Sequence, residues 1–394
     1  MASRLRALFT REFGRIWWVS FSAAAAGFFL FPTAPFRLRE LGAPPEAAGW
    51  FLGGLTYGSA AAAAWTGALG DVLGRRRVLS TAGVTLAGLA AVYAVVPDWR
   101  VLVALSIPHG VVWSGLLTSA NSELVHVLPP ERRAEGIAWF GVATILAIAA
   151  APAVGIWILE RDWRLLCGLI FALDLGVALL AMRLDRDPPV PADWRARLAP
   201  RRAVDWRTLA LAGALLAASF GYGGLTSFAA LYAESLGVVP KGVFFIAFAV
   251  TILVVRPLVA PLVDRRGARR ALPASFLAIA AGLVAVSLAA TRFGLVAAAA
   301  LFGLGFSVLG PAFTSWTVER VDAGRRGAAM GALLAAFDLG IGTGSIVLGP
   351  LIEHWDYATG FRAAALLALA AWPYLLLAER RLARRPSPFR SVDR

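Results

Sequence analysis

The segment GALGDVLGRRR at residues 67–77 determines how the rest of this sequence is interpreted. It places one acid and three arginines directly after a long apolar run, with Gly70 and Gly74 where the chain has to turn sharply. A related segment, APLVDRRGARR, follows another apolar run at residues 260–270, displaced by 193 residues. The same displacement relates Arg132-Arg133 to Arg325-Arg326 and Glu160 to Glu353. Three matches at one displacement indicate an internal duplication.

The composition around these segments is that of a membrane protein. Of the 394 residues, 59% are hydrophobic and 16% are charged, and the mean hydropathy is +0.71. A soluble domain carries about a quarter charged residues and needs a polar shell that this chain cannot supply. The sequence therefore predicts an integral membrane protein.

Twelve apolar runs are long enough to cross a bilayer as helices, since a hydrocarbon core about 30 Å thick needs about 20 apolar residues per helix. The runs are rich in Ala, Leu and Gly and lack the alternation of a membrane barrel, so no strands are expected. The predicted spans are approximately 16–36, 47–69, 78–96, 101–124, 135–158, 164–182, 208–231, 243–263, 271–290, 293–317, 328–351 and 361–378. We therefore expect an all-α polytopic membrane protein with twelve transmembrane helices.

The distribution of basic residues predicts the orientation. The N-terminal tail and every second loop together hold 29 of the 38 Arg and Lys residues, against eight on the other side, with Arg256 inside a span. Cytoplasmic loops carry such an excess, so both termini are expected in the cytoplasm, with the chain in a bacterial inner membrane. Topology thereby explains the net charge of +14, and no nucleic-acid partner is expected.

A long polar segment divides the spans into two sets of six. Residues 183–207 contain seven arginines and the run DPPVP at 187–191. Parallel six-helix repeats are a transporter architecture with the substrate site between the halves. The predicted domains are an N-terminal six-helix bundle at 1–183, a cytoplasmic linker at 184–207, a C-terminal six-helix bundle at 208–380 and a cytoplasmic tail at 381–394.

The cysteine and histidine content excludes several kinds of site. Cys167 is the only cysteine, which excludes an intramolecular disulfide, and His109, His126 and His354 lack metal-ligand spacing. The sequence has no Gly-x-x-x-x-Gly-Lys nucleotide-binding loop, which disfavours ATP-driven transport. We expect no metal and no cofactor.

These features together resemble the major facilitator superfamily over almost the whole chain, and its bacterial efflux-type members in particular. The resemblance rests on the 67–77 motif with its degenerate copy, and on two further stretches. These are RRAEGIAWFG at 132–141, and RGAAMG at 326–331 running to FDLG at 337–340. The resemblance implies the major facilitator fold, in which two pseudo-symmetric six-helix bundles expose a central site to one side at a time.

The resemblance implies that the 67–77 loop acts as a conformational gate. In the superfamily, the acid corresponding to Asp71 is thought to engage span eleven and hold the cytoplasmic side shut, and exposed N–H groups at a helix N-terminus do favour anions. The arginines have acidic lipid headgroups or Glu123 as alternative partners. Simple anchoring at the cytoplasmic surface explains the arginines nearly as well, but it does not explain Asp71 and Asp264. The gating residues are Gly67, Asp71, Gly74, Arg75, Arg76, Asp264, Gly267, Arg269 and Arg270.

Span five carries A-x-x-x-A-P-x-x-G at residues 147–155, which is similar to the antiporter motif G-x-x-x-G-P-x-x-G of the superfamily. Small residues allow helices to approach closely, and a proline bends the span. The similarity implies that Ala151, Pro152 and Gly155 belong to an interface that seals the leak pathway of an exporter. Ordinary packing in an alanine-rich protein is the alternative.

Four ionisable residues stand out well inside the predicted spans, where charge is costly and often functional. Arg256 and Asp338 have opposite charge and comparable depth, so they form either a coupling pair or a purely structural one. His109 either titrates or is a neutral histidine hydrogen-bonded between helices. These three are the coupling candidates, and Asp174 has no assigned role. The efflux-type pattern has an arginine where this chain has Ser106, so coupling rests on the second half or uses another ion.

The resemblance places spans one, four, seven and ten around the central site. Their central stretches carry aromatic side chains and a few hydroxyls, which suit a lipophilic or amphipathic solute better than a sugar. The alternative is that many of these aromatics face lipid or pack between helices. The cavity candidates are Phe31, Trp113, Tyr222, Thr226, Phe306 and Trp316.

These features predict a monomeric secondary transporter, not an enzyme, that moves a small organic solute through a lipid bilayer by alternating access. Proton-coupled export is the leading hypothesis, with another coupling ion as an option. An uptake or facilitative carrier of the same fold is the alternative. A membrane sensor would need a soluble output domain, for which the tail at 379–394 is too short, and an intramembrane enzyme would need a catalytic cluster instead of dispersed ionisable residues.

Overall fold

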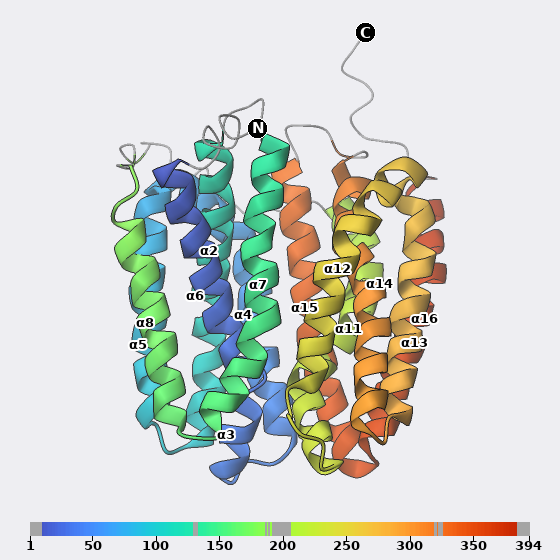
Figure 1. Cartoon of the computed structure of the whole chain (residues 1–394). Helices are drawn as coiled ribbons and strands as arrows, with labels where there is room; N and C mark the ends of the chain where they lie inside the picture. Colours follow the sequence, from blue (N-terminus) through green and yellow to red (C-terminus); the bar gives the residue numbers. More distant parts are fainter. Residues whose placement is uncertain are drawn as a thin grey trace.

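A computed structural model shows twelve long helices and one short helix among the residues that it describes (Figure 1). The structure describes residues 10–128, 133–185, 187, 190, 206–318, 321 and 326–383, and this part of the chain contains no strand. The helices are α2 (Arg11–Leu30), α3 (Ala34–Glu40), α4 (Glu46–Leu73), α5 (Arg75–Val95), α6 (Trp99–Val127), α7 (Arg133–Leu159), α8 (Trp163–Ala181), α11 (Trp206–Ser235), α12 (Val243–Arg266), α13 (Ala268–Leu288), α14 (Arg292–Val318), α15 (Arg326–His354) and α16 (Tyr357–Ala383).

Each predicted span after the first corresponds to one helix whose ends differ from the prediction by a few residues, and the first corresponds to α2 and α3. In the described part of the chain, ten helical segments are long and apolar enough to cross a membrane, and α12 contributes a shorter apolar stretch, Val243–Val259. The first span is interrupted between α2 and α3, where Pro32 and Pro35 lack the N–H groups of a continuous helix. At this break the Thr33 hydroxyl donates to the carbonyl of Phe29 at 2.6 Å.

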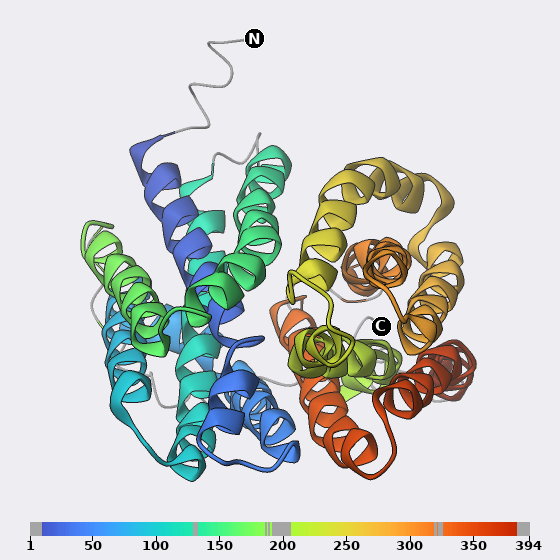
Figure 2. The same ribbon diagram turned by 60° about the horizontal axis from the view of Figure 1, so that its bottom comes forward.

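The helices form two groups that follow the order of the sequence. Helices α2 to α8 lie in one group and α11 to α16 in the other, as Figures 1 and 2 show. Across the boundary, α4 packs against α15 and α7 packs against α12. The start of α2 and the end of α16 lie at one end of the molecule, called here the terminal side. Helix α3 and the connection between α11 and α12 lie at the opposite side (Figure 1).

The two groups share the geometry of one turn. Gly74 separates α4 from α5, and Gly267 separates α12 from α13. Both glycines have positive φ, +97° and +81°, a conformation that L side chains disfavour. They are displaced by 193 residues, the displacement that relates the two loop motifs in the sequence. The backbone therefore supports the duplication independently of sequence identity.

The packed core extends through both groups. One large cluster of buried apolar side chains joins α11 to α16 and takes in residues of the first group, and two further clusters lie within the first group. Large apolar side chains also remain exposed, among them Leu258 at 69% and Phe293 at 80%. Exposure of this extent is expected where the solvent is lipid, which is as apolar as the side chains themselves.

Candidate transport site

An aromatic cavity lies at the boundary between the two helix groups. Its volume is about 220 Å³, six of its lining residues are aromatic, and Asp338 is the only charged residue in its described lining. The lining residues are Ala24, Phe28, Phe31, Leu52, Leu55, Thr56, Ser59, Trp113, Leu117, Thr144, Ile148, Tyr222, Thr226, Phe306, Leu334, Phe337, Asp338 and Ile341. This first cavity has the chemistry of a site for a largely apolar solute with few polar groups.

A second cavity of about 270 Å³ adjoins the first. On α15 it extends back to Met330, close to the start of the helix, whereas the first cavity extends to Ile341. Arg256 of α12 is the only charged residue in its described lining. The two linings share Ile148, Phe306, Leu334 and Phe337. The pair of cavities therefore runs from the centre of the molecule toward the terminal side.

Asp338 connects the two helix groups. The hydroxyl of Ser59, on α4, donates to Oδ2 of Asp338 at 2.6 Å. Arg256 forms no hydrogen bond or ion pair with any described residue, so the ion pair considered from the sequence is not formed in this structure. The structure places these two coupling candidates in adjoining cavities, and their role in coupling stays a prediction.

Between the first cavity and the opposite side, α4 and α15 approach to backbone contact. A Cβ atom on Gly49 would overlap the carbonyl oxygen of Ser345, so only glycine permits this approach. Eight residues further along α4, Tyr57 Oη lies 2.9 Å from Thr343 Oγ1 of α15. We call the contact formed by these four residues the α4–α15 seal.

Charged side chains also join the two groups at the opposite side. Arg39 Nη2 lies 2.7 Å from Glu234 Oε2. Lys241 Nζ lies 2.7 Å from Glu234 and 3.9 Å from Glu160, which directly follows α7. The same ammonium lies 5.3 Å from the ring centroid of Phe36, within the range of a cation–π interaction. Each of these pairs, apart from Lys241 with Glu234, therefore joins one group to the other at this side.

Five of the six predicted cavity residues line the first cavity, and one does not. Trp316 is 1% exposed and packs against Phe313 in the core of the second group, with ring centroids 6.1 Å apart. Sequence reasoning missed Ser59 and Phe337, which enter the lining from α4 and α15. The candidates that line this cavity are Phe31, Trp113, Tyr222, Thr226 and Phe306, and their role in binding a substrate stays a prediction.

Two further ionisable residues at membrane depth line neither cavity. His109 is buried between α6 and α5, where its ring stacks on Tyr93 and its Nδ1 lies 3.4 Å from the tyrosine hydroxyl. This is the interhelical, hydrogen-bonded placement considered from the sequence. Asp174 is buried on α8. Its backbone lies close to Gly83 of α5, because a Cβ on Gly83 would lie 2.7 Å from the Asp174 carbonyl oxygen.

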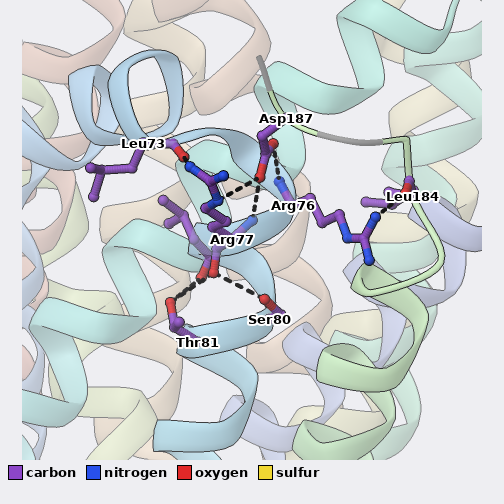
Figure 3. Close-up of polar contacts among 8 residues, drawn as sticks. Leu73, Arg76, Arg77, Ser80, Thr81, Leu184 and Asp187 are labelled. Carbon is purple, nitrogen blue, oxygen red and sulfur yellow. Dashed lines mark hydrogen bonds and ion pairs between the residues drawn. The ribbon is translucent and has the colours of Figure 1, made fainter. Parts of the chain in front are cut away.

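Asp187, in the linker between the two groups, contacts the end of the 67–77 loop (Figure 3). The Asp187 carboxylate accepts hydrogen bonds from the backbone N–H groups of Arg76 at 3.0 Å and Arg77 at 2.9 Å, in the first turn of α5. A carboxylate in this position caps the helix and faces the positive end of its dipole. The Arg76 guanidinium also donates to the carbonyl of Leu184 at 3.3 Å. This role of Asp187 was not predicted from the sequence.

Arg75 contacts Glu123, which the sequence offered as an alternative to lipid headgroups, and its Nη1 lies 3.6 Å from Oε2 of Glu123. In the second copy of the motif, Arg269 pairs with Glu379 of α16 at 3.1 Å, and Arg270 is exposed. One arginine of each loop therefore contacts a neighbouring helix, Arg75 on α6 and Arg269 on α16.

The acids of the two loop motifs cannot be placed in the same way. Asp71 lies in the last turn of α4 and Asp264 in the last turns of α12, but their side chains lie outside the described residues. Gly67 lies one turn before Asp71 in the same helix. Engagement of a helix N-terminus by these acids stays a prediction.

The small residues of α7 allow close packing on two faces. Pro152 lies inside the helix, and a Cβ on Gly155 would lie 3.0 Å from the Phe29 ring of α2. On another face, a Cβ on Gly242, just before α12, would lie 3.2 Å from Cα of Ala153. The helix therefore bridges the two groups, and its predicted role in sealing an exporter stays a prediction.

Replacement of Asp187 by alanine is expected to lower the stability of the protein, because loss of a helix cap costs about 1 kcal/mol. The measurement is the midpoint of thermal unfolding in detergent. Asp185→Ala is the matched control, since Asp185 is exposed and has no hydrogen-bond partner among the described residues. Equal midpoints for the two variants would show that the cap contributes no stability.

Comparison with known proteins identifies the family. Residues 16–253 and 241–393 match the sequence profile of the Major Facilitator Superfamily. The chain belongs to this superfamily. It is 29% identical over 250 residues to the uncharacterized MFS-type transporter YhhS of Salmonella enteritidis PT4. It is also 29% identical over 235 residues to the uncharacterized MFS-type transporter BMASAVP1_A0869 of Burkholderia mallei. These alignments cover 64% and 59% of this major facilitator chain, and 60% and 57% of the relatives.

Solved structures share the fold of this major facilitator. The human organic anion transporter MFSD10 superposes with a TM-score of 0.70 at 17% identity, over 93% of this chain and 100% of the other. The nucleoside transporter NupG superposes with a TM-score of 0.70 at 15% identity, over 96% of this chain and 100% of the other. The all-α major facilitator fold expected from the sequence is thereby confirmed, and the chain is a multi-pass membrane protein.

Proposed function

We propose that this major facilitator is a proton-coupled exporter of a small lipophilic or amphipathic organic solute. The observation that carries the proposal is the position of Asp338, which lies in an aromatic cavity between the helix groups and bonds to Ser59 across their boundary. Binding or release of a proton at this carboxyl changes both the charge of the cavity and a contact between the halves. Protonation and rearrangement of the two halves are thereby linked.

The proposed orientation places the terminal side in the cytoplasm of a bacterial inner membrane, because basic residues accumulate on that side. With this orientation, the α4–α15 seal and the ion pairs of Glu234 close the periplasmic side. The second cavity then extends toward the cytoplasm, and the conformation is the one that receives solute from inside the cell.

Export then requires the two groups to rock about the central site. The seal and the Arg39–Glu234 pair separate as the periplasmic side opens, and the solute leaves as a proton reaches Asp338. We propose that the 67–77 loop, with Asp71 as its acid, holds the cytoplasmic side shut in that second conformation. Pro152 and the small residues of α7 keep the two groups close enough to prevent a leak.

The transport test begins with a ligand-stabilisation screen of the purified protein, and the best hit is then followed in proteoliposomes. For an exporter that exchanges solute for protons, the solute is expected to accumulate in vesicles with an acidic lumen, and a protonophore is expected to abolish the accumulation. Accumulation only with an acidic exterior would instead identify proton-coupled uptake. Equilibration that ignores the pH gradient would identify a facilitative carrier, and either result would contradict the proposal.

A further inference from the structure

The two cavities contain one negative and one positive side chain that the protein does not pair with each other. Asp338 has the Ser59 hydroxyl as its partner, and Arg256 has none among the described residues. Within the described linings, Tyr222 is the only other side chain with an ionisable group, and it is neutral near physiological pH. The combined lining therefore carries one unit of each charge and no net charge.

Aromatic side chains lie where the two cavities meet. Phe306 and Phe337 line both cavities, and their ring centroids lie 6.1 Å apart. The ring of Tyr222 lies 4.6 Å from that of Phe306. An occupant that extends from one cavity into the other would thus pass from the acid to the base along an aromatic wall.

A solute with a single charge would satisfy only half of this arrangement. Arg256 lines the second cavity and is exposed, so its charge becomes costly when a solute displaces the water around it without supplying a counter-charge. A monocation would pair with Asp338 and add a second positive charge near Arg256, and a monoanion would do the reverse. A solute with both charges would pair with both residues and lay its apolar part against Phe306 and Phe337. The face of Phe31, which lines the same cavity as Asp338, would add attraction for the positive group.

We propose that the substrate class of this transporter is zwitterionic: an organic solute whose cationic group binds at Asp338, whose acidic group binds at Arg256, and whose apolar segment joins the two. The inference rests on the proposed transport function and names the chemistry of the same site. It also gives the exchange a physical basis, because a proton on Asp338 and the cationic end of the solute exclude each other. The other hydroxyl groups in the described lining of this cavity carry no charge near neutral pH, so Asp338 sets the pH dependence of binding. They belong to Thr56, Ser59, Thr144, Tyr222 and Thr226.

The test uses matched probes whose charges do not titrate. The zwitterion is benzyldimethylammonio-propanesulfonate, the cationic analogue is benzyldimethylpropylammonium, and the anionic analogue is phenylbutanesulfonate. Sulfobetaines with pentyl and heptyl spacers extend the distance between the two charges. Binding is measured by titration calorimetry on the full chain in detergent, near neutral pH and without any gradient.

The wild type is expected to bind at least one zwitterion about tenfold or more tightly than either singly charged analogue. Asp338→Asn is expected to remove the preference over the anionic analogue, and Arg256→Gln the preference over the cationic one. Asp185→Asn and Arg292→Gln change exposed residues outside both cavities and are expected to keep the wild-type pattern. Acidification is expected to weaken zwitterion binding in the wild type and not in Asp338→Asn.

The comparison of probes on the wild type needs no substitution, so it tests the preference for a zwitterion even where a variant misfolds. If the wild type bound the cationic or the anionic analogue as tightly as it bound every zwitterion, the proposed substrate class would be wrong. If such a protein still moved a neutral or singly charged solute in exchange for protons, the proposed function would stand alone. A zwitterion preference without any flux driven by a pH gradient would support the substrate class and contradict the proton-coupled function.

Discussion

Asp338→Asn is expected to abolish solute accumulation driven by a pH gradient while leaving the protein folded. Asparagine has nearly the shape of aspartate and can still accept a hydrogen bond from Ser59, but it cannot gain or lose a proton. In proteoliposomes with an acidic lumen, accumulation should fall to the level of empty vesicles. Exchange of solute for solute at equal pH and saturating concentration should continue, because that process needs no change in the charge of the cavity.

Two further variants separate proton binding at Asp338 from its hydrogen bond across the boundary. Ser59→Ala removes the bond and keeps the carboxyl, so this variant is expected to retain accumulation driven by the pH gradient at a reduced rate. Asp185→Asn makes the same chemical change at an exposed carboxyl and should behave as the wild type. Accumulation by Asp338→Asn at the wild-type level would remove this residue from the coupling mechanism.

The fold could be predicted from hydropathy and the internal repeat. A membrane-spanning helix must satisfy its own backbone hydrogen bonds, so the length of an apolar run predicts the length of a helix. The duplicated loop also predicted equivalent turns, and Gly74 and Gly267 share a positive φ. The break at Thr33 was not predicted, because the run around it is apolar throughout and hydropathy does not register the loss of backbone donors at prolines.

The site was predicted less completely, because the sequence gives the depth of a side chain more readily than its direction. Tyr222 and Trp316 both lie on helices expected to surround the cavity, but only Tyr222 lines it. Successive side chains on a helix differ in direction by about 100°, so a small error in the orientation of a helix moves a residue from the cavity into the core. His109 contacts Tyr93 between α6 and α5, which is one of the two placements considered from the sequence.

Two contacts between distant segments were not predicted, although the contact of Arg75 with Glu123 was among the alternatives. Asp187 and Arg76 are 111 residues apart, and an acid in a proline-rich linker carries no sign of the helix that it caps. Ser59 was missed for a related reason, since only the packing of α4 against α15 brings it to Asp338. Both contacts are consequences of how the helices assemble, which neither periodicity nor composition records.

Gly49→Val is expected to abolish transport by preventing closure of the periplasmic side. A Cβ at this position would overlap the carbonyl oxygen of Ser345, and a backbone atom cannot move aside as a flexible side chain could. Helices α4 and α15 would then be held apart, and the conformation with the opposite side open would accumulate. Solute flux in proteoliposomes should fall to the level of empty vesicles.

The change in conformation can be measured with a cysteine introduced by Thr56→Cys, at a position that is 5% exposed near the seal. A membrane-impermeant thiol reagent applied from the periplasmic side should label this cysteine in the Gly49→Val background and leave it unlabelled otherwise. The native Cys167 is buried and contributes little background.

Gly88→Val is the matched control, because a Cβ on Gly88 has no atom within 4 Å, and this variant should transport and label as the wild type does. Since both variants place valine inside a helix, a loss of activity confined to Gly49→Val, together with new labelling at residue 56, would assign the effect to the seal. Protection of that cysteine and undiminished flux in Gly49→Val would show that transport does not require the two backbones to meet.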